Sequence, residues 1–256
     1  KTAYMKANFP VDYMASVLTA DAGDVDKVAQ VVAECVRMGL KILPPSVNES
    51  RGNFTVVDDK SIRFGLYSIK NFGTGVADSI METVDSAGPF TDVADFLSRV
   101  TDKNLNKKSL ESLIKCGALD ERTGGDFSAA RGDSSPAGGG VSSATLADSR
   151  GALLQNIDLL LSFHREHTDI PANQISLFGS AVRSKATLAL KEASQATMAE
   201  RLTWEKELLG LYVSGHPLDA HKEKLKKQKM GIMQAKEKFP KGAETVIAGL
   251  LENLQY

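Results

Sequence analysis

The sequence has few cysteines, no excess of charge and no long apolar run. Only Cys35 and Cys116 occur among its 256 residues, so a disulfide framework is not expected and a reducing compartment, the cytoplasm, fits best. The formal net charge of -1 excludes a basic coat for nucleic acid, so any contact with DNA has to be local. No signal peptide or membrane-spanning run is recognisable, and we expect no membrane partner.

Patterns for metal or acid–base chemistry are also missing. Asp58 and Asp59 have no partner at catalytic spacing and are better interpreted as a turn. His216 lies in a Ser-Gly-His-Pro segment that breaks a helix, and no Cys/His spacing predicts zinc. We therefore expect no metal, no cofactor and no catalytic residue in this chain.

Helical periodicity dominates what is present and predicts a mainly α fold. The clearest helix covers 25–38, with Asp24 as its N-cap and Gly39 at its end. Pro10 is expected to start an earlier helix, after Phe9. The apolar face of this opening segment is formed by Tyr4, Met14, Val17 and Leu18.

Short β-prone runs follow at 54–57 and 62–64 and predict a small hairpin. Before them, Ile42 and Leu43 run into two prolines, which favours an extended crossing. Beyond residue 88, Thr91 is expected to cap one helix and Asn106 another, which ends at Gly117.

The composition then changes. Residues 121–150 are rich in Gly, Ser, Ala and Asp and predict a flexible linker. Helices are expected over 153–167 and again over 198–213, the latter with one apolar side. That side is formed by Trp204, Leu208, Leu209 and Tyr212. A weakly alternating run at 245–251 is β-prone, and the two ends of the chain indicate an internal piece of a longer protein.

Residues 66–80 contain the main candidate motif of the chain. They predict two short helices folded about a Gly-x-Gly hairpin, in which Gly73 and Gly75 can take positive φ and leave the backbone bare. Bare amides at the start of a helix suit a phosphate oxygen. The candidate DNA-binding residues are Lys70, Asn71, Gly73, Thr74 and Gly75. The alternative is a protein–protein hairpin in which the glycines serve only the turn.

A second, degenerate hairpin unit is expected to stack on the first. Lys107 and Lys108 lie in the first turn of the helix that Asn106 caps, where the helix dipole disfavours cations unless an anion is near. A bound phosphate explains the two lysines, and so does a solvated surface.

Several segments, taken in their order and spacing, resemble one family. They are residues 4–18, 26–39, 41–50, 64–73, 106–108 with 113–120, 174–179 and 207–218. Together they are similar to the alpha subunit of DNA polymerase III, the bacterial replicative polymerase of the C family. The resemblance covers nearly the whole chain except the Gly/Ser-rich linker.

This resemblance implies a domain organisation. Residues 1–60 would end the fingers domain, 61–120 would form a tandem helix-hairpin-helix that binds duplex DNA, and 121–200 would hold the linker and a helix. A helical connector at 201–241 and the first strand of an OB-fold at 242–256 would follow. The palm domain, whose aspartates hold Mg²⁺ for nucleotidyl transfer, would lie upstream, so this piece is expected to be inactive alone.

The resemblance also implies partners, namely primer–template DNA, the sliding clamp and other replicase subunits. Gln174, Leu177 and Phe178 fit the Gln-x-x-Leu-Phe peptide that docks on the clamp, because exposed apolar side chains on a polar segment are costly unless a partner buries them. Alternatively, Leu177 and Phe178 pack on this protein's own helices. For the whole chain, the alternatives are a freestanding helix-hairpin-helix module of DNA repair or recombination, and a purely structural scaffold.

Overall fold

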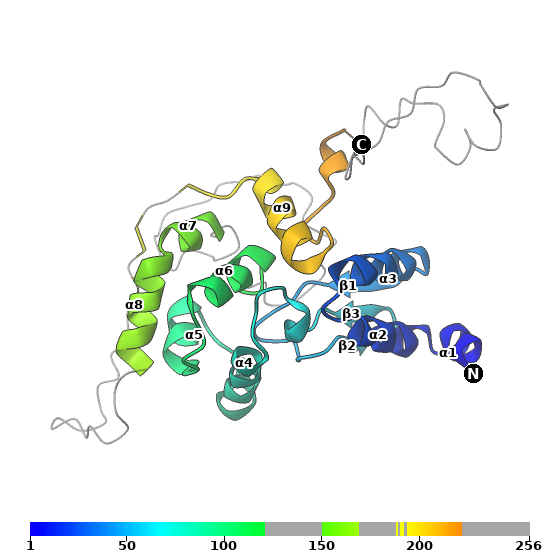
Figure 1. Cartoon of the computed structure of the whole chain (residues 1–256), viewed down its shortest axis with the longest axis horizontal. Helices are drawn as coiled ribbons and strands as arrows, with labels where there is room; N and C mark the ends of the chain where they lie inside the picture. The colour runs from blue at the N-terminus through cyan, green and yellow to red at the C-terminus, as the bar shows by residue number, and fades with distance from the viewer. Residues whose placement is uncertain (121–149, 169–187, 189, 192–193, 222–256) are drawn as a thin grey trace, which may run out of the picture.

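The computed structural model describes residues 1–120, 150–168, 188, 190–191 and 194–221 (Figure 1). This part is mainly helical with a small sheet, which confirms the predicted fold class. The α-helices are α1 Thr2–Asn8, α2 Pro10–Ala20, α3 Val25–Arg37, α4 Thr74–Ala87, α5 Val93–Arg99, α6 Lys107–Cys116, α7 Arg150–Gln155, α8 Ile157–Thr168 and α9 Met198–Leu209. Two 3-10 helices, η1 Leu66–Ser68 and η4 Pro217–His221, complete the set in these ranges. Within them, no helix is long and apolar enough to cross a bilayer.

The helices α1 to α3 and the sheet lie at one end of the molecule, α7 and α8 at the other, and α4 to α6 between them (Figure 1). Pro10 is the first residue of α2, as predicted. At α3, the Asp24 carboxylate accepts a hydrogen bond from the Lys27 amide at 3.2 Å, and Gly39 follows the helix with φ 78°. The predicted start and end of α3 are therefore confirmed.

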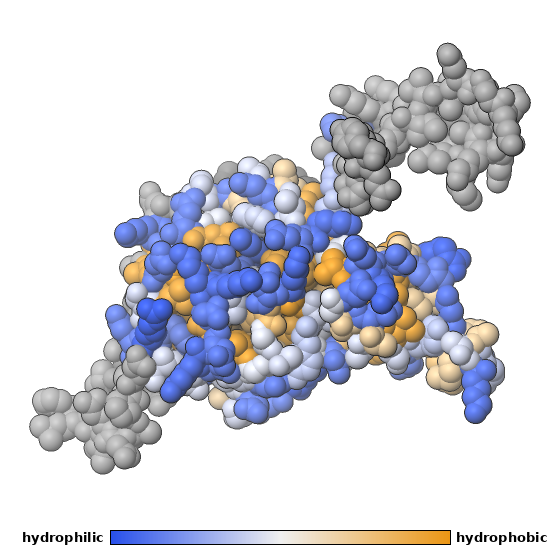
Figure 2. All heavy atoms as spheres, in the orientation of Figure 1, coloured by the Kyte–Doolittle hydropathy of each residue, from blue (hydrophilic) through white to orange (hydrophobic). Residues whose placement is uncertain are grey.

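The expectation that Tyr4 shares the apolar face of the opening segment is wrong. Tyr4 is 64% exposed, and α1 buries none of its side chains, whereas Met14 and Leu18 of α2 are buried. The helix break at Phe9 turns α1 away from the core, so its face is separate from that of α2. Residues of intermediate hydropathy accordingly show on α1 at the edge of the molecule (Figure 2).

The sheet contains the predicted hairpin and one further strand. β2 (Thr55–Asp58) pairs with β3 (Ser61–Arg63) in antiparallel fashion, with an irregularity in register between Val56 and Asp58. The run at Ile42 and Leu43 was expected only to be extended. It forms β1 (Lys41–Leu43), which pairs parallel to β3, so the strand order is β1-β3-β2.

The loop between β1 and β2 connects the sheet to the helices beyond it. The Val47 amide donates to the Ala118 carbonyl at 2.9 Å, after the end of α6. Asn48 donates to the Phe90 carbonyl at 3.1 Å and accepts from the Phe90 amide at 2.7 Å, before α5. This loop therefore fixes the position of α5 and α6 relative to the sheet, through contacts between residues that are distant in sequence.

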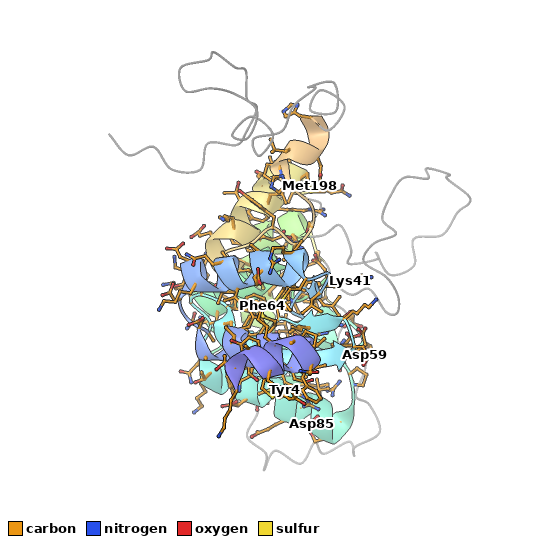
Figure 3. All side chains as sticks on the ribbon, turned by 90° about the vertical axis from the view of Figure 1, so that its right-hand side faces the viewer. Tyr4, Lys41, Asp59, Phe64, Asp85 and Met198 are labelled. Atoms are coloured by element: carbon orange, nitrogen blue, oxygen red, sulfur yellow. The ribbon has the colours of Figure 1, made fainter. Side chains whose placement is uncertain are left out.

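One hydrophobic core runs through the described residues. Phe64 lies in the interior, whereas Lys41, Asp59 and Asp85 lie at the periphery (Figure 3). The largest fully buried side chains are Phe64, Phe96, Leu18, Ile62, Leu66, Ile80, Leu97, Leu110, Leu113, Ile114, Leu153 and Leu160. They come from helices α2 and α4 to α8, from η1, from β3 and from the residue that follows β3, so the hairpin region and the N-terminal helices share one core.

Both cysteines are buried free thiols. Burial raises the pKa of Cys35 to about 11 and that of Cys116 to about 12. Because the thiolate is the reactive form, neither thiol is set up for chemistry at neutral pH.

Three expectations for the described residues from 150 onward need correction. The helix predicted over 153–167 is two helices, α7 and α8, which meet at Asn156. The helix predicted over 198–213 ends at Leu209, because Gly210 follows in the left-handed conformation with φ 78°. The linker was expected to include Arg150, but this residue begins α7 and its side chain is only 5% exposed.

The attachment of α1 to α3 generates a pH-dependent prediction. Glu34 accepts hydrogen bonds from Arg37 and from Lys6 of α1, and these lower the pKa of Glu34 from 4.5 to about 2. A carboxylate whose pKa is lower in the folded chain than in the unfolded chain stabilises the fold. This contribution is fully present when the pH is above the unfolded pKa, and it is lost as the pH falls through the folded pKa. We expect α1 to gain mobility as the pH falls from 4.5 towards 2, measured by ¹⁵N relaxation of residues 2–8.

The variant Glu34→Gln should show the same mobility of α1 already at neutral pH. Glu207→Gln, a neutralisation at an exposed position of α9, is the control and should leave α1 unchanged. Equal relaxation of residues 2–8 in the wild type and in Glu34→Gln at neutral pH would contradict this account of the attachment.

Candidate nucleic-acid interface

The start of α4 differs from the starts of four other helices in the described residues. Side chains cap α3, α5, α6 and α9, in each case by accepting a hydrogen bond from a backbone amide of the first turn. At α4 the N-cap is Gly73, and no side chain accepts from the first turn. The first amides of a helix have no partner within the helix, so those of Thr74 and Gly75 are available to an external acceptor. The partial positive charge of the helix terminus favours an anion there.

Neither glycine uses its freedom to take positive φ. Gly73 has φ -78° and ψ 141°, which is extended backbone, and Gly75 lies within α4. The residue with positive φ is Asn71, at 64°. Asn tolerates the left-handed region because its short polar side chain bonds locally, and the chain therefore reverses two residues earlier than expected. What Gly73 provides is open space, since no atom lies within 4 Å of the position of a Cβ there.

The first helix of this hairpin was also predicted wrongly. Instead of a helix over residues 66–72, the chain forms the 3-10 helix η1, and Ile69 after it is extended. The apolar face was identified correctly, because Leu66, Ile69 and Phe72 are all buried. The Lys70 amide donates to the Leu208 carbonyl of α9 at 3.2 Å, so this amide is already used, whereas the Lys70 side chain is exposed. The hairpin loop is thus held against α9.

The second hairpin consists of α5, the loop over 100–106, and α6. Asp92, rather than the predicted Thr91, caps α5. Asn106 caps α6 as predicted, and with Ser109 it forms a complete capping box. The start of α6 is therefore partly satisfied by its own side chains, unlike the start of α4.

The two lysines at the start of α6 have different surroundings. Lys107 forms an exposed ion pair with Asp158 of α8, with 2.9 Å between Nζ and Oδ1. Lys108 is exposed as well, and its side chain extends from the first turn of α6. The ion pair gives Lys107 a partner within the protein, which leaves Lys108 as the better candidate of the two for a phosphate contact.

The loops of the two hairpins lie close together. The Asp102 carboxylate is 3.5 Å from the position that a Cβ on Gly75 would occupy, so the loop before α6 reaches the start of α4. Lys103 and Asn104 next to it are exposed, and they were not among the candidate DNA-binding residues although both lie in the loop of the second hairpin. The predicted residues at 70–75 and at 107–108 thus lie in two neighbouring hairpin loops or in the first turn of the helix that follows each loop.

The other candidate chemistry has a simple structural explanation. His216 lies in a turn, where its amide donates to the Asp219 carboxylate at 2.8 Å and its Nδ1 accepts from the Leu218 amide at 3.1 Å. This confirms the predicted turn. Among the described residues, no group of three or more His, Cys, Asp or Glu side chains is arranged to hold a metal ion.

Several predicted features lie outside the described residues. They are the clamp-docking residues Gln174, Leu177 and Phe178, the linker over 121–149, and the β-prone run at 245–251. The predictions for them stay predictions.

Comparison with known proteins adds evidence of two kinds. A model of the helix-hairpin-helix motif matches residues 39–126, which include both hairpins. The chain is 35% identical to DNA polymerase III subunit alpha of Pseudomonas aeruginosa, in an alignment that covers all of this chain and 21% of that protein. It is 36% identical to the same subunit of Thermus aquaticus over 85% of this chain and 16% of that protein. For Escherichia coli K12 the values are 32%, 98% and 20%.

The chain therefore spans about a fifth of the length of these curated relatives. The similarity extends well beyond the helix-hairpin-helix motif, since nearly all of the chain aligns. The chain belongs to the family of the DNA polymerase III alpha subunits and aligns with about a fifth of their length.

Proposed function

We propose that this segment binds duplex DNA within a DNA-directed DNA polymerase. Its backbone amides would contact the phosphates of the DNA. The observation that carries the proposal is the start of α4, where Gly73 leaves the first amides without a side-chain cap and without a Cβ in front of them. Phosphate oxygens are acceptors of the right charge for such amides. The exposed lysines Lys70, Lys103 and Lys108 would add charge on either side.

Contact with phosphates carries no information about base sequence. A polymerase that copies every template needs a hold of this kind on the duplex. The near-neutral chain fits a local contact, because its attraction would come from a few amides and lysines rather than from a strongly basic surface. We infer a hold that is weak in isolation and sensitive to salt.

The nucleotidyl-transfer chemistry belongs, in this proposal, to other parts of the longer relatives. The palm domain would hold the Mg²⁺ ions through its aspartates, and the present segment would be inactive alone. The division of this chain into the end of a fingers domain, a tandem hairpin region, a connector and the start of an OB-fold is likewise a proposal that rests on the resemblance, as is a cytoplasmic location.

We further propose that Gln174, Leu177 and Phe178 dock on the sliding clamp. The support is the spacing Gln-x-x-Leu-Phe and its position after the hairpins. Each apolar side chain that fills a pocket on a partner would contribute roughly 1.5 to 3 kcal/mol. Gln174 offers donors and an acceptor to orient the bound segment. Other replicase subunits are expected partners because of the resemblance to the alpha subunits.

The DNA contact is tested by filling the cap position of α4. Gly73→Asp places a carboxylate where it can accept from the first-turn amides, and the extended backbone at Gly73 suits an N-cap. The variant should be at least as stable to heat as the wild type but should bind duplex DNA about tenfold more weakly, because one charge-assisted contact is lost. Fluorescence anisotropy with duplexes of two unrelated sequences would measure this.

Gln30→Glu is the control, since it adds the same charge at an exposed position of α3. It should change the affinity by less than twofold, and both duplex sequences should bind alike. If Gly73→Asp binds as tightly as Gln30→Glu, the start of α4 is not the contact.

The clamp contact is tested with the double variant Gln174→Ala and Phe178→Ala. Binding of the purified chain to immobilised sliding clamp should fall below detection by surface plasmon resonance, because both the orienting group and one apolar anchor are removed. Ile175→Ala with Ser176→Ala, at the two tolerant middle positions, should bind as the wild type does. Unchanged binding by the first variant would refute the assignment.

A further inference from the structure

Helix α9 contacts three separate parts of the described chain. It packs along α6 of the second hairpin, and its Leu208 carbonyl accepts from the Lys70 amide of the first hairpin. At its end, Gly210 lies against Val25 at the start of α3, where a Cβ would come within 2.7 Å of the Val25 carbonyl oxygen. The position of α9 between α6 and α3 is visible in Figure 1. A shift of α9 would therefore move the two hairpins relative to each other.

A buried arginine fixes α9 to the end of α6. Nε and Nη2 of Arg150 lie 2.7 Å and 2.5 Å from Oδ2 of Asp120, just after α6. Nη1 donates to the Lys115 carbonyl in the last turn of α6 at 3.2 Å, and to Oε1 of Glu205 on α9 at 2.9 Å. The Arg150 and Glu205 side chains are 5% and 0% exposed. One guanidinium thus connects α7, α6 and α9.

Glu205 extends this connection to the segment after α9. Its Oε2 accepts from the amides of Val213 and Ser214 at 2.8 Å each, and its Oε1 accepts from the Ser214 hydroxyl. Leu208 follows Glu205 by three residues, about 4.5 Å along the helix axis. The ion pair therefore fixes where the Leu208 carbonyl lies along the axis of α9, and so where it accepts the hydrogen bond from the Lys70 amide.

The geometry leaves little freedom for the arginine. Gly117, with φ 80°, lies directly under the guanidinium, and a side chain there would overlap it. Burial favours the neutral form of Arg150, but the neighbouring Asp120 and Glu205 carboxylates outweigh it and raise the pKa of the guanidinium above its ordinary value. A buried charge tolerates displacement poorly, because each lost partner leaves an uncompensated charge in the interior.

We propose that Arg150 and Glu205 are positioning residues for DNA binding, which fix α9 so that both hairpins face one duplex. This inference rests on the proposed hold on DNA by the hairpins. Neither residue would touch DNA, since both are buried. Their effect is on how many phosphate contacts the two loops make at the same time.

The test compares the salt dependence of duplex binding in the full chain and in Arg150→Met. The slope of log K against log salt reports the number of phosphate contacts, and each lost contact reduces it by about 0.9. We expect Arg150→Met to bind roughly tenfold more weakly and with a slope reduced by about one. A variant that only lowers the folded fraction would bind more weakly with an unchanged slope, which would overturn the proposal.

Two further variants keep the test decisive if Arg150→Met folds poorly. Arg150→Met combined with Glu205→Gln and Asp120→Asn removes every charge of the cluster and should fold, yet retain the reduced slope. Arg150→Lys keeps the charge without the forked contacts and should be intermediate. Arg37→Met is the matched control, because it removes one charge from an exposed ion pair on α3 and should keep the wild-type slope.

Hydrogen exchange of the Lys70 amide separates this proposal from the proposed function. The exchange should be faster in the neutralised triple variant than in the wild type, while Arg37→Met leaves it unchanged. If the wild type has no affinity for duplex, the proposed function fails, and unaltered exchange at Lys70 would in addition refute the positioning of the hairpin. If the wild type binds duplex but the triple variant keeps its slope and its exchange rate, only the present inference fails.

Discussion

The buried guanidinium of Arg150 imposes the strongest constraint on the described part of the chain. An arginine cannot lose its charge in a protein, so its removal from water has to be matched by acceptors. The acceptors are the Lys115 carbonyl and Asp120 at the end of α6, and Glu205 on α9, while Arg150 itself begins α7. They meet at one point only if α6, α7 and α9 adopt one arrangement. The cluster is weak evidence for stability and better evidence for a unique arrangement of the elements around it.

The start of α4 contrasts with the Arg150 guanidinium, whose donors have acceptors within the protein. The chain uses side chains to cap α3, α5, α6 and α9, and it pairs Lys107 with Asp158. At Gly73 it has neither a capping group nor a Cβ. A glycine at this position gives up the local hydrogen bond that Ser, Thr, Asp or Asn would make. The amides of the first turn of α4 therefore stay uncapped, and the loop of the second hairpin lies next to them.

Sequence patterns predicted the features that depend on neighbouring residues. The caps Asp24 and Asn106, the glycine at the end of α6 and the β2–β3 hairpin were identified because each involves residues a few positions apart. The helix over 66–72 was wrong because Ile69 is extended and Asn71 takes the left-handed conformation, neither of which the periodicity indicates. The contacts of Arg150 were missed because its carboxylate partners are 30 and 55 residues away in the sequence. The composition of residues 121–150 therefore placed Arg150 in the predicted linker.

The candidate site follows the same division between local and distant effects. Both loops were predicted, since glycine and lysine positions are visible in the sequence, but their proximity was not, because Asp102 and Gly75 come together through packing of the hairpins. The use of the Lys70 amide by α9 was equally invisible.

In the proposed DNA contact, the uncapped amides at the start of α4 are suited to a duplex that moves. They are fixed by the fold, so a phosphate contact costs no side-chain entropy, whereas an exposed lysine loses rotamer freedom when it pairs. They also carry only a partial charge, which limits the attraction at each phosphate. A hold built from several such contacts depends on their relative placement more than on total charge, and that placement is what α9 and its buried ion pair determine.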